Sequence, residues 1–187
     1  MSLECTRRGF LGGVLSAGVG ATILSTPAWG ALEARKPTDL LFPKKRKTPL
    51  PGGYMGKILR VNLTSGKITT ENLPEEPVLR KWIGGKGLGQ LILQRELPEG
   101  VSPLSPDNPL IFMTGPLVGT GLTPGSTKYF VITLNNETGF TVGMARASGY
   151  WGPYLKFAGY DGVIINGASK KPVYLWVHEG KIGRAHV

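Results

Sequence analysis

The segment GYWGPYLKFAGYDGVIING, residues 149–167, combines two kinds of residue that rarely occur together. It contains five aromatic residues and five glycines, and its only charged side chains are Lys156 and Asp161. A plain core segment would not contain so many glycines, and a surface loop would not carry so many aromatics. The composition predicts a stretch in which tight packing and close backbone approach are both needed.

A short helix followed by a buried strand is predicted inside this segment. Pro153 suits a first helical position, the residues after it supply one or two helical turns, and Gly159 ends them. Tyr154 and Phe157 are expected to anchor this helix on a sheet. The sequence GVIING, residues 162–167, then has the length and composition of a core strand.

Alternating apolar residues predict strands along most of the remaining chain. Residues 54–73 read as a hairpin with a Ser-Gly turn. Further strands are expected at 110–115, 127–135, 139–146 and 172–180, and 139–146 is expected to pair with 127–135 across Asn136-Glu137-Thr138 as a second hairpin. Two short helices are expected at 74–85 and 86–97, the second with an apolar side formed by Leu88, Leu91, Ile92 and the stem of Arg95. The predicted fold class is α+β and mainly β, with antiparallel or mixed sheets and short inserted helices.

Composition bounds the kinds of site that the chain can build. The 187 residues include a single cysteine, Cys5, which excludes an internal disulfide, a zinc site of several thiolates and a cysteine-ligated iron–sulfur cluster within this chain. The formal net charge is +10. Such a charge suits an anionic partner, and it equally describes a generally basic surface.

The first thirty residues have the organisation of an export signal. Thr6-Arg7-Arg8-Gly9-Phe10-Leu11 resembles the twin-arginine signature, and a weakly apolar run (10–24) and a small-residue cleavage site (28–30) follow it. The run is too short for an ordinary bilayer span, and an uncleaved membrane anchor is the alternative. We therefore expect residues 1–30 to engage the twin-arginine export machinery and to direct the protein to the periplasm.

Residues 31–52 are expected to be a solvated linker. They contain several prolines and the basic run KKRK at 44–47. One short basic run in an exported protein does not favour nucleic acid as a partner. The folded domain is therefore expected to begin at about residue 53.

Two glycine-rich loops have the character of anion sites. GPLVGTGLTPGSTK (115–128) follows a buried strand and ends on Lys128, which places a cation beside backbone N–H groups. GGKGLG (84–89) opens a helix and carries Lys86. The 115–128 loop has the order of neither a Walker nor a dinucleotide motif. An ordinary loop and a tight interhelix turn are the alternative interpretations.

A third candidate lies just before the predicted helix. The run Arg146-Ala147-Ser148-Gly149 brings a cation and a hydroxyl close to a helix start, where free backbone N–H groups favour an anion. Gly149 and Gly152 are expected to let the backbone approach such a ligand. The neighbouring aromatics either pack in the core or line a flat, ring-shaped ligand.

These motifs resemble the N-terminal domain of tungsten- or molybdenum-containing aldehyde ferredoxin oxidoreductases. The resemblance covers residues 53–181 and rests on GKILRVNLTSGKI, WIGGKGLG, PLSPDNPLIFMTGPLVGT, TGF and SGYWGPYLKFAGYDGVIING. It implies a β-rich base for a metal held by two pterin dithiolenes, whose phosphates are linked through magnesium. It also implies oxidation of a small aldehyde, or of a related carbonyl or acyl group, with electrons leaving through a [4Fe–4S] cluster to ferredoxin or a similar carrier.

The resemblance assigns five cofactor-binding residues. Lys128 stands where the family usually has an arginine, so the charge is kept and the bidentate geometry is lost. Arg146, Ala147, Ser148 and Gly149 stand where the family pattern is Asn-Ser-Gly-Gly. Arginine cannot ligate magnesium, so a direct phosphate contact by Arg146 is the hypothesis.

The resemblance also implies that this chain is part of a longer enzyme. The family's cluster ligands and catalytic acid/base are expected outside it, so no catalytic residue or metal ligand is assigned here, and the chain is expected to be inactive alone. IGRAHV (182–187) departs from the strand pattern and is predicted to be a non-native tail. The alternative function is a non-catalytic exported β-domain that binds an anionic ligand or a partner protein. Formation of a homo-oligomer is left open.

Overall fold

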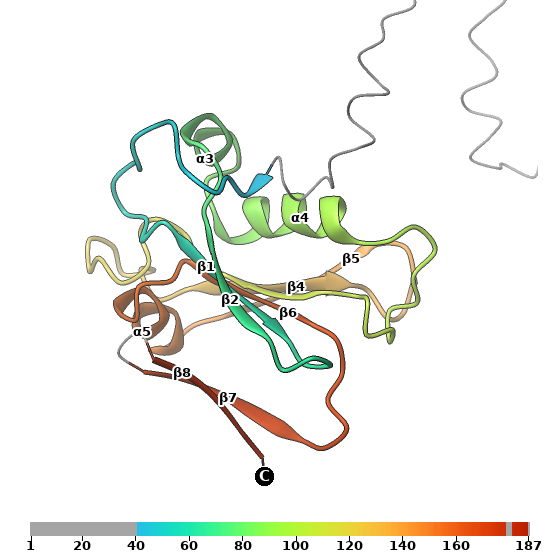
Figure 1. Ribbon diagram of the computed structural model, residues 1–187. Coiled ribbons are helices and arrows are strands. Elements are labelled where there is room, and N and C mark those ends of the chain that lie inside the picture. Colours follow the sequence, from blue (N-terminus) through green and yellow to red (C-terminus); the bar gives the residue numbers. More distant parts are fainter. Residues whose placement is uncertain (1–40, 179–180, 187) are drawn as a thin grey trace, which may run out of the picture. The chain divides into compact units, whose positions relative to one another are not determined.

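A computed structural model describes residues 41–178 and 181–186 of the chain (Figure 1). The predicted export signal and residues 31–40 of the predicted linker lie outside the described residues. Within the described part, no helix is both long enough and apolar enough to cross a membrane.

A six-stranded mixed sheet forms the centre of the domain. Its order is β2-β1-β6-β3-β4-β5, in which β1 and β6 are parallel and all other neighbours are antiparallel. The strands span Lys57–Asn62 (β1), Ile68–Asn72 (β2), Leu110–Met113 (β3), Tyr129–Leu134 (β4), Val142–Ala147 (β5) and Gly162–Asn166 (β6). The predicted α+β fold and both predicted hairpins are confirmed. The aromatic and glycine-rich segment at 149–167 supplies β6, which lies inside the sheet between β1 and β3.

Three helices are described, at Glu76–Trp82 (α3), Gly85–Glu96 (α4) and Trp151–Phe157 (α5). All three were expected, but α5 begins two residues before Pro153. Proline is tolerated there because the N–H groups of the first helical turn have no partner within the helix. Beyond β6, Val173–His178 (β7) pairs antiparallel with Lys181–His186 (β8). The expectation that the last residues leave the strand pattern is therefore wrong, because they continue a hairpin, while their non-native origin stays a prediction.

Strand alternation gives the sheet two apolar faces. On one face, Ile58, Ile111, Ile132 and Ile164 are fully buried in a cluster that includes residues of α3 and α4. On the other face, the cluster contains Leu59, Val61 and Val163 of the sheet with Leu155 of α5 and Leu175 and Val177 of β7. Figure 1 shows α3 and α4 on one side of the sheet and α5 on the other. The helices thus cover both faces of the central strands.

The apolar side of α4 is wider than expected. Leu88, Leu91 and Ile92 are buried as predicted, but Leu93 is buried as well and Arg95 is exposed. Leu93 belongs to the same cluster as Leu79, Leu41 and Phe42. The helical period of the apolar residues places Leu93 on the solvent side of α4, but in the structure this residue is buried in the cluster that contains α3 and residues 41–42.

Residues 41–52 pack on the domain, so the prediction of a solvated linker is wrong for this part. Leu41 and Phe42 are buried in the core. The Arg46 guanidinium donates hydrogen bonds to the carbonyl oxygens of Leu73 and Pro74, which follow β2. An arginine in a basic run thus serves as a fixed donor to backbone acceptors, which a charge pattern cannot reveal.

Acid should weaken the attachment of this segment. Donors from the Thr48 hydroxyl and from the Lys47 and Thr48 N–H groups hold the pKa of Glu75 well below its usual value, at about 2. A depressed pKa contributes stability that is present above the unfolded-state value, about 4.3, and is lost as the pH falls through the folded-state value. The free energy of unfolding, measured with urea, should therefore fall less steeply in Glu75→Gln than in wild type as the pH is lowered between these two values.

The matched control for this series is Glu99→Gln, because Glu99 is an exposed carboxylate outside the segment. It should keep the wild-type slope against pH. A wild-type slope in Glu75→Gln would show that the attachment of residues 46–48 does not depend on the charge of Glu75.

Candidate functional site

Three glycine-rich stretches meet at one end of the sheet, where β3 ends, β4 begins and β5 ends. The Gly85 N–H donates to the Thr114 carbonyl oxygen at 2.8 Å, which joins the start of α4 to the loop after β3. A Cβ atom on Gly84 would lie 2.8 Å from that oxygen and 3.0 Å from Gly115 Cα. The two loops can approach this closely only because position 84 has no side chain.

The start of α5 closes the third side of this region. Gly152 is buried, and a Cβ atom there would lie 3.2 Å from Val118 Cγ1 and 3.3 Å from the Thr127 carbonyl oxygen. Gly152 therefore allows α5 to pack against the 115–128 loop and does not face a ligand, contrary to the sequence expectation. Gly149 differs, because it is exposed, has a φ of +100° and has open space around it.

The structure brings the five predicted cofactor-binding residues together. Tyr129 pairs with Ala147 across β4 and β5, and Phe130 pairs with Arg146. Lys128 and Ser148 follow in the same register, with Lys128 Nζ 3.5 Å from Ser148 Oγ. The polar groups of Lys128, Arg146 and Ser148 are exposed, and Gly149 continues the chain towards α5.

The charge of this region suits an anion. Lys86, Lys128 and Arg146 are exposed at the same end of the sheet. The carboxylate of Asp161 lies nearby but is paired with Lys156. In the described part of the chain, no group of three or more His, Cys, Asp or Glu residues could hold a metal ion. The arrangement therefore offers exposed cations, which are groups that bind phosphate.

The aromatic residues of α5 divide between packing and exposure. Trp151 lies 4.5 Å from the Tyr129 ring and 5.3 Å from the Phe112 ring, measured between centroids. Tyr154 and Phe157 are 65% and 67% exposed, so the expectation that they anchor the helix is wrong. Leu155 is the buried residue that holds α5 on the sheet. Gly152, Pro153 and Lys156 are the other buried residues of this helix.

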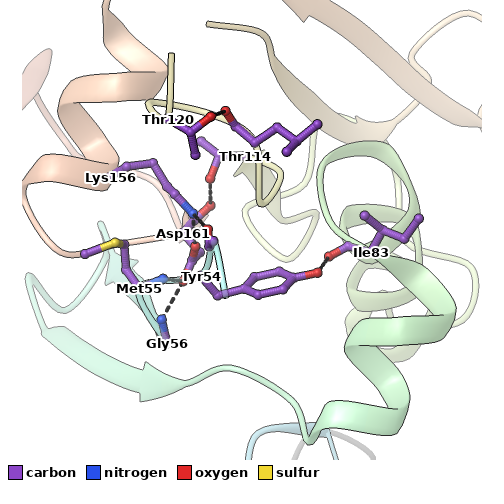
Figure 2. Close-up of polar contacts among 10 residues, drawn as sticks. Tyr54, Met55, Gly56, Ile83, Thr114, Thr120, Lys156 and Asp161 are labelled. Atoms are coloured by element: carbon purple, nitrogen blue, oxygen red, sulfur yellow. Dashed lines mark hydrogen bonds and ion pairs between the residues drawn. The ribbon is translucent and has the colours of Figure 1, made fainter. Parts of the chain in front are cut away.

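A buried ion pair that sequence reasoning did not assign lies behind the loops (Figure 2). Lys156 Nζ lies 2.5 Å from Asp161 Oδ1, and the two side chains are 5% and 3% exposed. Lys156 also donates to the Gly53 carbonyl oxygen, and Asp161 Oδ2 accepts from the N–H groups of Met55 and Gly56. The sequence contained a signal, because these are the only charged residues in an otherwise apolar and glycine-rich stretch.

Tyr54 connects this ion pair to the start of α4. Its hydroxyl donates to the Ile83 carbonyl oxygen, and Lys156 Nζ lies 5.8 Å from the centre of its ring. Burial and the negative charge of Asp161 raise the pKa of Tyr54, while the Arg80 charge acts in the opposite direction. The phenol thus remains a neutral donor at physiological pH.

Comparison with known proteins identifies the family of this domain. The family described as aldehyde ferredoxin oxidoreductase, N-terminal domain, matches residues 58–185. A tungsten-containing aldehyde ferredoxin oxidoreductase of Pyrococcus abyssi is 48% identical over 130 residues, which cover 70% of this chain and 21% of the relative. An aliphatic sulfonate oxidoreductase, WOR-like subunit, of Pyrococcus furiosus is 44% identical over 132 residues, which cover 69% of this chain and 20% of the relative.

A solved structure shares the fold. The active-site complex BamBC of benzoyl coenzyme A reductase, in complex with 1,5-dienoyl-CoA, superposes with a TM-score of 0.69 and 34% identity, over 73% of this chain and 20% of that chain. The chain thus spans about a fifth of the length of the curated relatives it matches. The family match, the shared fold and the ordered motifs agree, and the chain belongs to the family of aldehyde ferredoxin oxidoreductase N-terminal domains.

Proposed function

We propose that this domain holds the phosphate groups of a tungsten-bound bis-pterin cofactor in an exported oxidoreductase of aldehydes or related carbonyl or acyl compounds. The observation that carries the proposal is the exposed pair of cations, Lys128 and Arg146, on adjacent strand ends beside two glycine-rich loops. The printed names of the relatives support the metal and the substrate class, since several are tungsten-containing aldehyde ferredoxin oxidoreductases.

The residues present fit a phosphate group better than a bare cation. The described residues offer ammonium, guanidinium and hydroxyl groups here, and the one buried carboxylate is already paired. Arg146 donates only, so in this proposal it contacts a phosphate oxygen directly. Magnesium linking the phosphates would take its remaining ligands from the cofactor, from water or from other parts of the protein.

In this proposal the metal–pterin group supplies the two-electron chemistry, and this domain supplies binding and orientation. Lys128 and Arg146 neutralise phosphate charge, and the loops 84–87 and 114–127 shape the surface on which the cofactor rests. A [4Fe–4S] cluster held by other parts of the enzyme passes electrons to ferredoxin or a similar carrier. The export signal at residues 1–30 directs the protein to the periplasm, and the domain alone has no turnover.

Replacement of the two cations tests the proposal. In the 187-residue chain, pyrophosphate serves as the probe and isothermal calorimetry measures its affinity. A charge-assisted hydrogen bond contributes about 1.5–3 kcal/mol, so Lys128→Ala and Arg146→Ala should each weaken binding by about tenfold or more, and the double variant further. Lys67→Ala, an exposed lysine in the β1–β2 turn, is the matched control and should bind as wild type.

Two results would contradict the proposal, and the second would favour its rival. If wild type binds pyrophosphate and the double variant binds equally well, these residues are not the phosphate site. If the purified full-length protein contains no tungsten, molybdenum or pterin, the domain is a non-catalytic binding module instead.

A further inference from the structure

The buried pair Lys156–Asp161 has contacts that a simple core filler would not need. We propose that this pair, together with Tyr54, is a positioning unit that sets the arrangement of the two glycine-rich loops at residues 84–87 and 114–127. The inference rests on the proposed function only for its consequence, which is the affinity of those loops for phosphate. The loops and their contacts stand on the geometry alone.

Asp161 joins two distant segments of the chain to its own. Its Oδ2 accepts hydrogen bonds from the N–H groups of Met55 and Gly56, at 2.9 and 2.7 Å. Its carbonyl oxygen accepts from both the N–H and the hydroxyl of Thr114, at 2.9 and 2.6 Å. Thr114 is the first residue of the loop at 114–127. The side chain and backbone of one residue therefore fix both the turn at 53–56 and the origin of the loop.

Lys156 fixes the opposite side of the same turn. Its ammonium donates to the Gly53 carbonyl oxygen at 2.6 Å. Gly53 has a φ of +87°, and a Cβ atom there would lie 2.5 Å from the Pro116 carbonyl oxygen. Gly119 is also close to this unit, because a Cβ on it would lie 3.7 Å from Lys156 Cβ. Movement of Lys156 would therefore reach the loop at two points.

Tyr54 extends the unit to the second loop (Figure 2). The carbonyl oxygen of Ile83 accepts from the Tyr54 hydroxyl. Ile83 has a φ of +59°, the only positive φ of a non-glycine residue in the described part of the chain. A branched side chain is strained in this region, and surrounding contacts must maintain it. The chain then enters Gly84, which lies against Thr114 and Gly115.

An ion pair is suited to this task where an apolar pair is not. Replacing a buried ion pair by apolar residues of similar volume often leaves stability unchanged or raises it, so burial alone does not explain the pair. Apolar side chains would leave the Gly53 carbonyl oxygen and the Met55 and Gly56 N–H groups without these partners. Because both side chains are almost fully buried, they act on a ligand only through the loops.

The test measures loop order and phosphate affinity separately from global stability. Amide hydrogen exchange by mass spectrometry is followed in the 187-residue chain for Lys156→Met, for Lys156→Met/Asp161→Asn and for Tyr54→Phe. The double variant removes both charges while keeping an oxygen acceptor for Met55 and Gly56. Arg60→Met is the matched control, because it breaks the ion pairs of Arg60 with Glu71 and Glu96 away from the loops.

The expected result is faster exchange confined to the two loops. Lys156→Met and the double variant should show it at 114–127 and 84–87, and Tyr54→Phe at 84–87 alone. The double variant should recover thermal stability relative to Lys156→Met without recovering loop protection. Pyrophosphate affinity of the folded protein should fall by about tenfold or more, the usual effect of removing an outer support of a binding site. Arg60→Met should lower stability and leave affinity unchanged.

Two results would overturn the proposal. One is exchange that becomes faster uniformly throughout the chain, and the other is a double variant in which the protection of the loops returns together with thermal stability. If Lys156→Met does not fold, Tyr54→Phe decides, since it removes a single hydroxyl; wild-type exchange at 84–87 would then reject the unit. If wild type fails to bind pyrophosphate, the proposed function is contradicted, while the exchange data still decide whether the unit positions the loops.

Discussion

Asp161→Ala is expected to lower the free energy of unfolding by about 3–5 kcal/mol, as is usual when one partner of a buried ion pair is removed. The variant leaves the Lys156 ammonium in an almost fully buried position without its carboxylate. It also removes the acceptor of the Met55 and Gly56 N–H groups. Chemical denaturation with urea, followed by tryptophan fluorescence, measures the loss.

Two further variants show whether charge or hydrogen bonding causes this loss. Asp161→Asn keeps one oxygen acceptor and should lose less than Asp161→Ala. Asp107→Ala removes an exposed carboxylate and should change stability by no more than about 0.5 kcal/mol. Equal, small losses in Asp161→Ala and Asp107→Ala would contradict the view that the buried pair holds the turn, β3 and β6 together.

Ile164→Ala is expected to lower the free energy of unfolding by about 2–5 kcal/mol. Ile164 is fully buried at the middle of β6, where it lies opposite Arg60 of β1 and Ile111 of β3. Truncation removes buried apolar surface and leaves a cavity between the sheet and the helices packed on this face, α3 and α4. The cavity cannot close easily, because β6 is hydrogen-bonded to β1 on one side and to β3 on the other. Urea denaturation of the folded chain gives the value.

A conservative variant and an exposed control complete this series. Ile164→Val removes one methylene group and should cost about 0.5–1.5 kcal/mol. Leu104→Ala changes a side chain that is 82% exposed and should be close to neutral. If Ile164→Ala were no more harmful than Leu104→Ala, β6 would not be the central packing element of the sheet.

Local signals were sufficient to predict most elements of the fold. The Ser-Gly turn and the alternation on either side of it predicted the β1–β2 hairpin, and alternation also predicted β4 and β5 as partners. These pairs are close in sequence, so short-range turn chemistry and hydrophobic period determine them. The parallel pairing of β1 with β6 joins residues about a hundred positions apart. No local pattern predicts such a pair.

The sequence predicted which residues lie at the candidate site, but it predicted their arrangement only in part. The predicted pairing of 127–135 with 139–146 puts the two candidate segments on neighbouring strands, but the register that places Lys128 beside Ser148 was not predicted. The roles of Gly152, Tyr154 and Phe157 were assigned wrongly, because they depend on which side of a two-turn helix meets the sheet. Packing against the 115–128 loop decides that orientation.

The sequence by itself determined the family, the fold class and the residues that carry positive charge to one end of the sheet. Tertiary structure alone decided that Lys156 and Asp161, the two charges within the aromatic and glycine-rich segment at 149–167, face each other in the interior. The physical reason is desolvation. Two charges can be buried only where each meets an opposite charge and fixed backbone partners. Those partners, Gly53, Met55 and Gly56, come from a turn far away in the sequence.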